Sequence, residues 1–560
     1  MKPIIVSILA DALRRAHDAG KLKSIPVEIG VEAPKDPAHG DLASNVALAM
    51  ARVEGQPPYA IAETILEHAV LPPEVLEAKL ARPGFINFRM SPAYWQGEIR
   101  RALREGAKFW RRSIGAGKKV QIEFLSANPT GPLTVGHGRN AVLGDTLARL
   151  YEAAGYAVTR EYYFNDGGRQ MKLLGESVRV RYLEELNRPA PPFPEDGYQG
   201  EYIRDIAREL ITKHGDSLID QKDIEPFRKA AVDAIFADIN RACERMGVRF
   251  DRYRSEQDLL KEGRIDAVLT ALESRGLLVE KDGATWLRGQ PLGLPKDVVL
   301  VRSGTEREPT YRTPDIAYHI EKLGAGFDAI IDVFGADHIA EHQQVLAALR
   351  ALGYDVAPIR VIIYQFVTLT RAGEKVKMST RKATYVTLDE LIDEVGADVV
   401  RFFFLFRKSD SHLDFDLDLA RRQAPENPVF YVQYAHARLA SVFREAAQRG
   451  LDRPEPDSAE VDLNLLSAEE MDLARRALGM PGIIEAATVE LEPHRIPFFL
   501  LDLAGEFHRY YNKPSNRIIG RELTGSDRAL SIARMYIAGL LKDALASGLE
   551  LIGVNAPERM

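Results

Sequence analysis

EFLSANPTGPLTVGHGRNAVLGD, residues 123–145, decides the fold of this chain. A strand pattern over 119–125 breaks there into a loop rich in Gly and Pro, residues that favour turns over regular structure. From Gly136 apolar residues recur at helical spacing until Gly155, and residues 157–164 (AVTREYYF) form a second strand pattern. Strand, loop, helix and strand predict a βαβ unit, and therefore an α/β fold with a parallel sheet.

The loop of this unit has features of a nucleotide-binding site. In βαβ units ligands lie beyond the carboxyl end of the strand, where backbone N–H groups and the helix dipole favour phosphate. Gly136 and Gly138 flank His137, so bare backbone could approach an adenine ring while the imidazole faces phosphates. The glycine spacing matches neither the dinucleotide fingerprint nor the P-loop. A histidine beside glycines also fits a purely structural loop, so this stretch alone leaves both interpretations open.

A second motif, KMSTR at 377–381, lies in a polar loop after the apolar run 361–369. A loop that carries Lys and Arg can close over a triphosphate and neutralise charge that develops on a pyrophosphate leaving group. A solvated basic loop explains the same residues if they are considered alone.

Together the two stretches resemble the paired motifs of class I aminoacyl-tRNA synthetases, His-x-Gly-His and Lys-Met-Ser-Lys-Ser. Thr134 replaces the first histidine; it can donate a hydrogen bond to a phosphate but cannot carry positive charge. Longer stretches such as YYFNDGGRQM, VGADVVRFFFLFRKSDSHLDFDLDLA and ENPVFYVQYAHARL narrow the resemblance to bacterial-type arginyl-tRNA synthetases, over essentially the whole chain. Lys377 is present, so the chain is similar to the members that retain this lysine.

The resemblance implies a two-step reaction. The carboxylate of arginine attacks the α-phosphorus of ATP, with Mg²⁺ bridging phosphate oxygens, and the tRNA ribose then takes the arginine and releases AMP. It also implies that arginine activation requires bound tRNA. The implied cofactor is ATP with Mg²⁺, the partners are arginine tRNA, L-arginine and ATP, and no residue is assigned to a metal. The implied catalytic residues are Thr134, His137, Lys377, Ser379 and Arg381. Those implied for ATP are Gly136, Gly138, Asn140, Asp337, His342 and Met378.

Asp337 and His342 follow the strand pattern AIIDVFG, whose carboxyl end faces the same crevice as the first loop. The resemblance assigns Asp337 to the ribose of ATP. His342 lies a turn into the next helix, where an exposed position with no ligand is equally compatible.

Two acidic residues could bind an arginine side chain, and this can be argued without the family resemblance. A guanidinium is a planar, permanently charged fork that pairs with carboxylates. Glu123 ends the first strand, and Asp315 lies in PTYRTPDIAYHIEK. An arbitrary acid is most often part of a surface salt bridge, but Glu123 lies in an apolar strand beside the nucleotide loop. The resemblance implies an arginine pocket of Glu123, Ser126, Asn128, Tyr311 and Asp315.

Contacts with tRNA are expected at both ends of the chain. Residues 507–521 (FHRYYNKPSNRIIGR) mix basic and aromatic side chains, a combination that binds single-stranded RNA and that an amphipathic core helix also shows. The resemblance implies that the amino-terminal part contacts the tRNA elbow and the carboxyl-terminal part the anticodon loop, although Phe85 also reads as a packing residue of a strand. The tRNA-binding candidates are Phe85, Asn87, Asn427, Gln433, Tyr434, Arg509, Arg517 and Met560.

Composition agrees with an intracellular, multidomain enzyme. The chain has 560 residues, 46% of them hydrophobic, a net charge of −7 and one cysteine, Cys243. The negative charge argues against indiscriminate nucleic-acid binding, but local basic patches still permit tRNA binding. A single cysteine excludes a disulfide framework. The apolar runs are too short to span a bilayer, so we expect a cytoplasmic protein with no membrane partner, monomeric and without an obligate protein partner.

The pattern along the chain predicts a Rossmann-like catalytic domain between an α/β domain and an all-helical domain. The predicted parts are an elbow-binding α/β domain (1–108), two catalytic halves (109–184 and 296–360), an insertion of unassigned function (185–295), the Lys-Met-Ser loop with connecting helices (361–427) and a helical anticodon-binding domain (428–560).

Three other functions stay open at this point. A class I synthetase for a neutral amino acid would leave Glu123 and Asp315 unpaired. A non-catalytic tRNA-binding relative is kept open by Thr134, whereas His137 and Lys377 speak against it. A nucleotidylyltransferase shares the fold and the His motif but needs no flanking RNA-binding domains, and fold alone cannot separate these functions.

Overall fold

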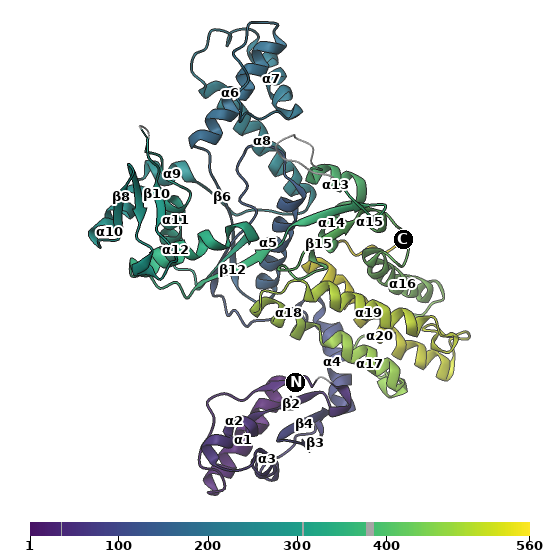
Figure 1. Ribbon diagram of the computed structural model, residues 1–560. Coiled ribbons are helices and arrows are strands. Elements are labelled where there is room, and N and C mark those ends of the chain that lie inside the picture. The colour runs from purple at the N-terminus through teal and green to yellow at the C-terminus, as the bar shows by residue number, and fades with distance from the viewer. Residues whose placement is uncertain (35, 305–306, 377–385) are drawn as a thin grey trace. The chain divides into compact units, whose positions relative to one another are not determined.

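The computed structural model describes residues 1–34, 36–304, 307–376 and 386–560. The chain divides into two compact units, each made of several segments (Figure 1). Unit 1 comprises Met1–Gly106, Val442–Leu478 and Arg517–Leu541, and unit 2 comprises Ala107–Ser441, Gly479–Asn516 and Lys542–Met560. The carboxyl-terminal region predicted as one helical domain therefore contributes to both units.

Unit 1 begins with an antiparallel sheet of order β1-β2-β4-β3, against which short helices pack. Pro92 at the start of α4 supplies a fixed φ, and the Ser91 side chain accepts a hydrogen bond from Tyr94 N–H, so the helix begins there. The elements are α1 (Lys2–Asp18), β1 (Val31–Glu32), β2 (Leu42–Ser44), α2 (Val46–Glu54), α3 (Pro58–Glu67), β3 (Val75–Ala81), β4 (Phe85–Met90), α4 (Pro92–Glu105) and α17 (Ala468–Leu478), which packs on α4.

Unit 2 is built on the predicted parallel sheet, which has five strands in the order β12-β11-β5-β6-β7. Strand order reverses between β5 and β11, so the loops that follow these two strands meet at one crevice, where α/β sheets bind ligands. The strands are β5 (Lys119–Glu123), β6 (Ala157–Phe164), β7 (Arg252–Ser255), β11 (Ala329–Gly335) and β12 (Ile359–Tyr364). Because β7 pairs with β6, the range 185–295 is not a single insertion, and this prediction needs correction.

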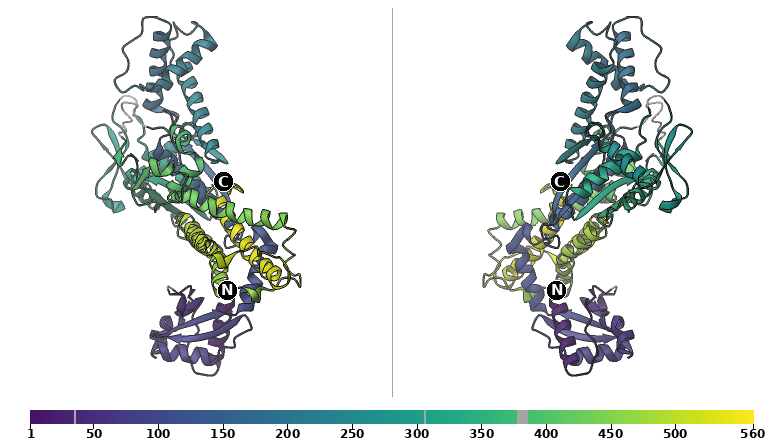
Figure 2. Two further views of the ribbon diagram at one scale, coloured as in Figure 1. Left: turned by 90° about the vertical axis from the view of Figure 1, so that its right-hand side faces the viewer. Right: turned by 90° about the vertical axis from the view of Figure 1, so that its left-hand side faces the viewer.

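The helix of the predicted βαβ unit is α5 (Val135–Ala153). It is buried along most of its length and packs on the sheet, on α14 and on α18. The helices α6 (Gly168–Glu185), α7 (Glu201–His214) and α8 (Glu225–Arg245) pack on one another and stand together in both views of Figure 2.

A smaller sheet of order β10-β9-β8 shares an apolar core with three helices. Leu272, Leu287, Leu300 and Leu349 are among the buried residues of this core, which lies beside the crevice and fixes the position of α11. The elements are α9 (Glu256–Lys261), α10 (Arg264–Ser274), β8 (Leu278–Lys281), β9 (Ala284–Leu287), β10 (Val298–Val301), α11 (Arg312–Gly324) and α12 (Ile339–Ala351).

The remaining elements follow β12. They are β13 (Val367–Arg371), β14 (Glu374–Lys375), α13 (Leu388–Val395), α14 (Ala397–Leu405), β15 (Leu413–Asp416), α15 (Leu417–Ala420), α16 (Pro428–Gln448), α18 (Met480–Val489), α19 (Arg495–Tyr511) and α20 (Gly525–Leu551). Short 3-10 turns are η1 (Pro37–His39), η2 (Gly106–Lys108), η3 (Gln290–Leu292), η4 (Ala336–His338), η5 (Leu463–Leu465) and η6 (Pro514–Asn516). The helical pattern predicted after residue 428 is confirmed.

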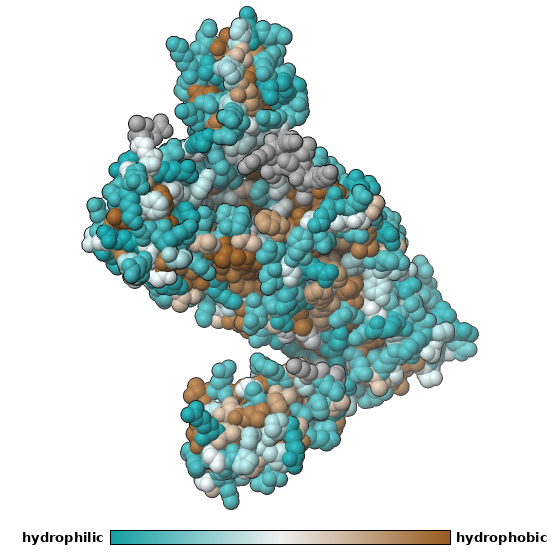
Figure 3. Space-filling model, in the orientation of Figure 1, coloured by the Kyte–Doolittle hydropathy of each residue, from teal (hydrophilic) through white to brown (hydrophobic). Residues whose placement is uncertain are grey.

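The face of unit 2 in Figure 3 is mostly hydrophilic, with hydrophobic residues gathered near β12. Among the described residues, no helix combines the length and the apolar character that crossing a bilayer requires.

A buried arginine ties four segments of unit 2 together. Arg401 of α14 is 1% exposed and donates to Asp145 Oδ2 at 2.6 Å, to Ile552 O and to Met246 O, both at 2.7 Å. Asp145 is equally buried and has one further ion pair, with the more exposed Arg149. The guanidinium therefore satisfies a buried charge and two backbone carbonyls at once.

We expect Arg401→Met to lower the free energy of unfolding by about 3–5 kcal/mol, because it leaves the buried Asp145 carboxylate without its buried cationic partner. Denaturant unfolding measures the change. Arg14→Met removes an exposed ion pair with Asp11 and should cost about 1 kcal/mol or less. Equal effects of the two substitutions would contradict the account.

Candidate functional site

The loop after β5 is held in an unusual backbone conformation. Leu125 has φ 67° and Ser126 φ 42°, values that side-chain-bearing residues rarely adopt. Leu125 N–H donates to Asn140 Oδ1 at 2.7 Å, and Ser126 Oγ donates to Glu123 Oε1 at 2.9 Å. Such conformations persist where surrounding contacts fix them, as they commonly do at binding sites.

Thr134 and His137 form the amino-terminal cap of α5. Thr134 Oγ1 accepts from His137 N–H at 3.4 Å, and Thr134 N–H donates to His137 Nδ1 at 3.2 Å. Since Nδ1 accepts, the ring proton lies on Nε2. Burial lowers the pKa of His137 to about 4, so at neutral pH the ring offers a hydrogen bond and no charge.

Gly136 and Gly138 differ in their surroundings. A Cβ at Gly136 would meet nothing nearer than Thr134 Oγ1 at 3.7 Å, so the helix N-terminus is open there. At Gly138 a Cβ would lie 2.6 Å from Leu388 Cδ1 and 3.0 Å from Phe404. Gly138 is therefore required for close packing, which corrects the idea that its bare backbone faces a ligand.

Asn140 also has a structural role. Besides the bond to Leu125, its Nδ2 donates to Val333 O at 3.0 Å, and its side chain is 5% exposed. The amide thus joins the ends of β5 and β11 across the crevice floor. The prediction that Asn140 contacts ATP needs correction, because its side chain is engaged within the fold.

The predicted acidic pair meets at the crevice. Glu123 ends β5 and is 4% exposed, and Asp315 lies in the first turn of α11, after Tyr311, which is 45% exposed. Burial, with a smaller effect from the charge of Glu123, raises the pKa of Asp315 to about 6. In the described part of the chain no ion pair of Asp315 is found. A cationic substrate group would supply the missing partner.

Asn128 lies on the same loop as Ser126. Its Oδ1 accepts from Asn165 N–H at 3.0 Å and its Nδ2 donates to Gln170 Oε1 at 3.2 Å. A carbonyl oxygen has two lone pairs, so Oδ1 can still accept from a substrate ammonium.

A third acid, Glu256, was missed by the sequence reasoning. It follows β7 directly, and its oxygens accept from Asn165 Nδ2 at 2.7 Å and from Tyr163 OH at 3.1 Å. Burial and then the charge of Asp315 raise its pKa to about 7. Its place at the carboxyl end of a parallel strand was the available signal, hidden because residues 185–295 had been read as an insertion.

These raised pKa values predict a pH-dependent affinity for a cation. Below about pH 6 Asp315 takes up a proton and loses its charge, so kcat/KM for arginine should fall by about tenfold per pH unit, whereas the guanidinium stays charged. Steady-state kinetics between pH 5 and 8 measure this. Protonation of Glu256, below about pH 7, steepens the decline. A flat profile would contradict the assignment.

The segment after β11 supplies Asp337 and His342. Asp337 lies in η4 and is exposed at the crevice side of the turn. His342 is 9% exposed, with its ring centroid 5.5 Å from Phe334 and 5.9 Å from His319, so the exposed position considered above is wrong. Burial lowers the pKa of His342 to about 4.

Lys377, Met378, Ser379 and Arg381 lie outside the described residues. The segment that follows them is nevertheless bonded to the first motif. Thr387 forms a bridge with Thr134, and Leu388 N–H donates to Leu133 O at 2.8 Å. The chain after the second motif is therefore anchored beside the cap of α5.

The tRNA-binding candidates have mixed surroundings. Asn427 is 3% exposed; its Nδ2 donates to Ala420 O and Arg422 O, and its Oδ1 accepts from Val429 N–H. Every polar atom is used, so Asn427 caps α16, and its assignment to tRNA needs correction. Gln433 keeps only Oε1 free of the bonds found, because Nε2 donates to Asp398 and Asn555.

The other candidates range from buried to exposed. Tyr434 stacks between Phe430 and His508, with the Arg438 guanidinium 4.6 Å from its ring. Phe85 and Met560 are 37% and 53% exposed, and Asn87, two residues after Phe85 on β4, is 9% exposed. Arg509 and Arg517 are exposed and belong to different units.

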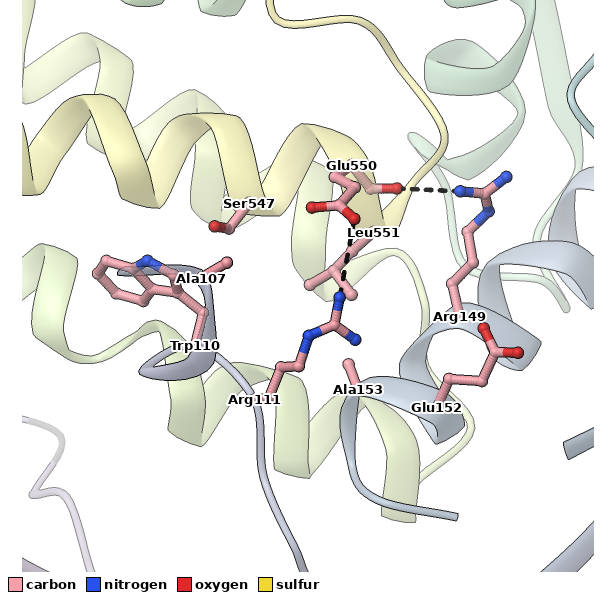
Figure 4. A pocket seen from close by; sticks show the side chains of 9 residues that line it. All are labelled: Ala107, Trp110, Arg111, Arg149, Glu152, Ala153, Ser547, Glu550 and Leu551. Atoms are coloured by element: carbon pink, nitrogen blue, oxygen red, sulfur yellow. Dashed lines mark hydrogen bonds and ion pairs between the residues drawn. The ribbon is translucent and has the colours of Figure 1, made fainter. Parts of the chain in front are cut away.

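A separate hollow in unit 2 lies away from the crevice. It is lined by Ala107, Trp110, Arg111, Arg149, Glu152, Ala153, Ser547, Glu550 and Leu551 (Figure 4). Arg149 lies twelve residues along α5 from His137, a distance on the order of 18 Å at 1.5 Å per residue. Arg111 and Arg149 both approach Glu550, so the cations at this hollow are already partnered.

Comparisons with known proteins agree across the chain. Family models match at residues 98–402 (tRNA synthetases class I (R), catalytic domain), 432–560 (DALR anticodon binding domain) and 4–90 (Arginyl tRNA synthetase N terminal domain). Proteins named arginine–tRNA ligase are similar: one from Desulfotalea psychrophila is 48% identical over 95% of this chain and 94% of its own, and one from Salinibacter ruber is 47% identical over 99% of each.

The fold is also that of a solved structure, Thermus thermophilus arginyl-tRNA synthetase, with a TM-score of 0.75, 24% identity and 99% of both chains covered. The family models match the catalytic region and both ends of the chain. They are consistent with the parallel sheet, the crevice at its switch point and the capped His137. This chain belongs to the arginyl-tRNA synthetase family of class I aminoacyl-tRNA synthetases.

Proposed function

We propose that this enzyme is an arginine–tRNA ligase, which activates arginine with ATP and transfers it to the 3′ end of arginine tRNA. One observation carries the choice of amino acid. Glu123, Asp315 and Glu256 lie at the carboxyl edge of the sheet, and burial raises the pKa of Asp315 and of Glu256. A neutral substrate would leave Asp315 and Glu256 without a cation, whereas a guanidinium neutralises them and offers a fork of donors.

The first step follows from the geometry of the cap. We propose that the α-carboxylate of arginine attacks the α-phosphorus of ATP in line, with Asn128 on the α-amino group and Ser126 and Tyr311 lining the pocket. His137 Nε2–H, the Thr134 hydroxyl and the open N-terminus at Gly136 hold phosphate oxygens. Positioning and hydrogen bonds to the developing charge supply the rate, since no covalent enzyme intermediate is needed.

Other groups complete the site in this proposal. Lys377 and Arg381, with Met378 and Ser379 beside them, neutralise the departing pyrophosphate, and Asp337 binds the ribose hydroxyls. His342, buried and neutral, supports this segment. Mg²⁺ would accompany ATP and would neutralise charge on its phosphates, a role that needs few protein ligands.

For tRNA we propose contacts at Phe85 and Asn87 with the elbow, and at Gln433, Tyr434, Arg509, Arg517 and Met560 with the anticodon side. Stacking by Tyr434 and phosphate contacts by the arginines suit an unpaired loop. We further propose a cytoplasmic monomer that activates arginine only with tRNA bound.

Pyrophosphate exchange into ATP, measured with each amino acid with and without tRNA, tests the proposal. We expect exchange with arginine alone, and only when tRNA is present. Exchange with arginine in the absence of tRNA would remove the coupling but keep the substrate. No exchange under any condition would overturn the enzymatic function and favour a tRNA-binding relative.

A further inference from the structure

A buried ammonium group lies beneath the arginine pocket. Lys322 of α11 is 1% exposed, and its Nζ donates to Glu123 Oε2 and, at 2.7 Å, to Asp332 Oδ1. Glu123 and Asp332 are register partners on the adjacent parallel strands β5 and β11. Two carboxylates side by side in a buried sheet repel each other, and Lys322 separates their charges.

His319 completes this cluster of Glu123, Lys322, Asp332 and His319. His319 Nε2 lies 3.0 Å from Asp332 Oδ2, and Nδ1 lies 2.8 Å from the backbone oxygen of Asp315. Both nitrogens therefore face oxygen acceptors. Lys322 and His319 together hold the pKa of Asp332 well below its usual range, after the opposing effect of burial.

Lys322 therefore compensates negative charge on both carboxylates. His319, Asp332 and the nearby His342 also have the spacing of a metal site, with ligand atoms within 4.8 Å of one another. The ammonium of Lys322 on Asp332 and the two hydrogen-bonded nitrogens of His319 already fill the roles that a metal would take. The Tyr318 ring, 4.3 Å from Nζ, covers the ammonium.

Glu123 is consequently fixed at both oxygens. Lys322 holds Oε2 and Ser126 Oγ holds Oε1, so the carboxylate has one orientation toward the crevice. Each oxygen retains a lone pair for a further donor. Asp315 forms no ion pair with this cluster. When it is ionised, its charge is therefore available to the substrate.

We infer that Lys322 is a positioning and specificity-determining residue for arginine: it neutralises and orients Glu123 so that the guanidinium forms its ion pair with Asp315 and only donates a hydrogen bond to Glu123. This inference rests on the proposed function. Lys322 touches no substrate atom and acts through Glu123. Its loss should therefore change arginine binding and leave ATP binding almost unaltered.

The test compares substitutions at position 322 in the full-length protein. Lys322→Met keeps the length of the side chain without its charge, and it should raise KM for arginine by about 30-fold or more, because it breaks a buried, hydrogen-bonded charge pair. KM for ATP should stay within about twofold, because the ATP groups lie at the cap of α5. Lys322→Arg keeps the charge and should restore KM for arginine to within about fivefold.

Arg160→Met is the matched control. Arg160 is a buried cation on β6 that pairs with Glu152 at 2.6 Å, away from the pocket. It should lower stability without changing KM for arginine. An unchanged KM for arginine in folded Lys322→Met, or equal changes in both KM values, would overturn the inference.

Asp332→Asn keeps the inference testable if Lys322→Met fails to fold. It keeps the shape of the side chain and removes one of the two carboxylate charges that Lys322 compensates, which alters the charge beside Glu123 and should raise KM for arginine about tenfold. An unchanged KM would again overturn the inference. Calorimetric titration of L-arginine into the protein with tRNA distinguishes a failure of the proposed function from a failure of this inference. Absence of binding to the wild-type protein counts against the proposed function. Normal binding by both variants counts against the role of Lys322.

Discussion

Asp315→Asn is expected to lower kcat/KM for arginine about 1,000-fold while KM for ATP changes less than twofold. The substitution keeps the shape of the side chain but removes the charge that the guanidinium meets, and loss of one partner of a desolvated charge pair costs about 2–5 kcal/mol or more. Glu123 cannot replace it, since Lys322 and Ser126 already engage its oxygens. If the ion pair stabilises the ground state and the transition state equally, the loss should appear mainly as a higher KM for arginine. If the ion pair also aligns the arginine carboxylate for attack, kcat should fall as well.

Aminoacylation and pyrophosphate exchange measure this loss over a range of arginine concentrations. Asp355→Asn is a matched control, because Asp355 is exposed and only accepts a hydrogen bond from Ala357 N–H. That variant should behave as wild type. Retention of more than about a tenth of kcat/KM by Asp315→Asn would contradict its place in the pocket.

His137→Ala is expected to reduce kcat of arginine activation by about 100- to 1,000-fold with little change in either KM, as for the loss of one preorganised donor to a transition state. The pKa of about 4 makes the expected contribution a hydrogen bond from Nε2. His137→Gln, which carries an N–H donor, should therefore recover part of the loss. Wild-type kcat should show no titration of this group between pH 6 and 9.

Thermal unfolding provides the control, because His137 also caps α5 through Thr134. Loss of the cap costs about 1 kcal/mol, too little to unfold the protein. If Ala and Gln at position 137 were equally inactive, or if kcat fell below pH 7 with the titration of His137, the neutral-donor role would be wrong.

Local patterns were sufficient to predict the βαβ unit, the parallel sheet and the helical carboxyl-terminal region. They also placed Glu123, Asp315 and His137 near one crevice, because each follows a strand or begins a helix at the same edge. These signals depend on residues close in sequence, such as the capping of α5 by Thr134.

What could not be predicted depends on contacts between distant segments. Lys322 meets Glu123 across 199 positions, and β7 joins the sheet after three helices, which brings Glu256 to the crevice. Asn140 and Asn427 were assigned to ligands through the family resemblance. In the structure both amides satisfy backbone groups, which no local pattern distinguishes from a role in binding.

Charging of arginine tRNA with arginine, lysine and citrulline tests the central claim most directly, because citrulline has the shape of arginine without its charge. If the carboxylates recognise both the charge and the forked shape of the guanidinium, charging with arginine should be efficient. The preference for arginine over lysine and over citrulline should be about 10,000-fold or more, as for sites whose buried polar groups would be left unpaired. Comparable charging with citrulline would show that the acids do not read the guanidinium charge, and comparable charging with lysine would show that they do not read its fork.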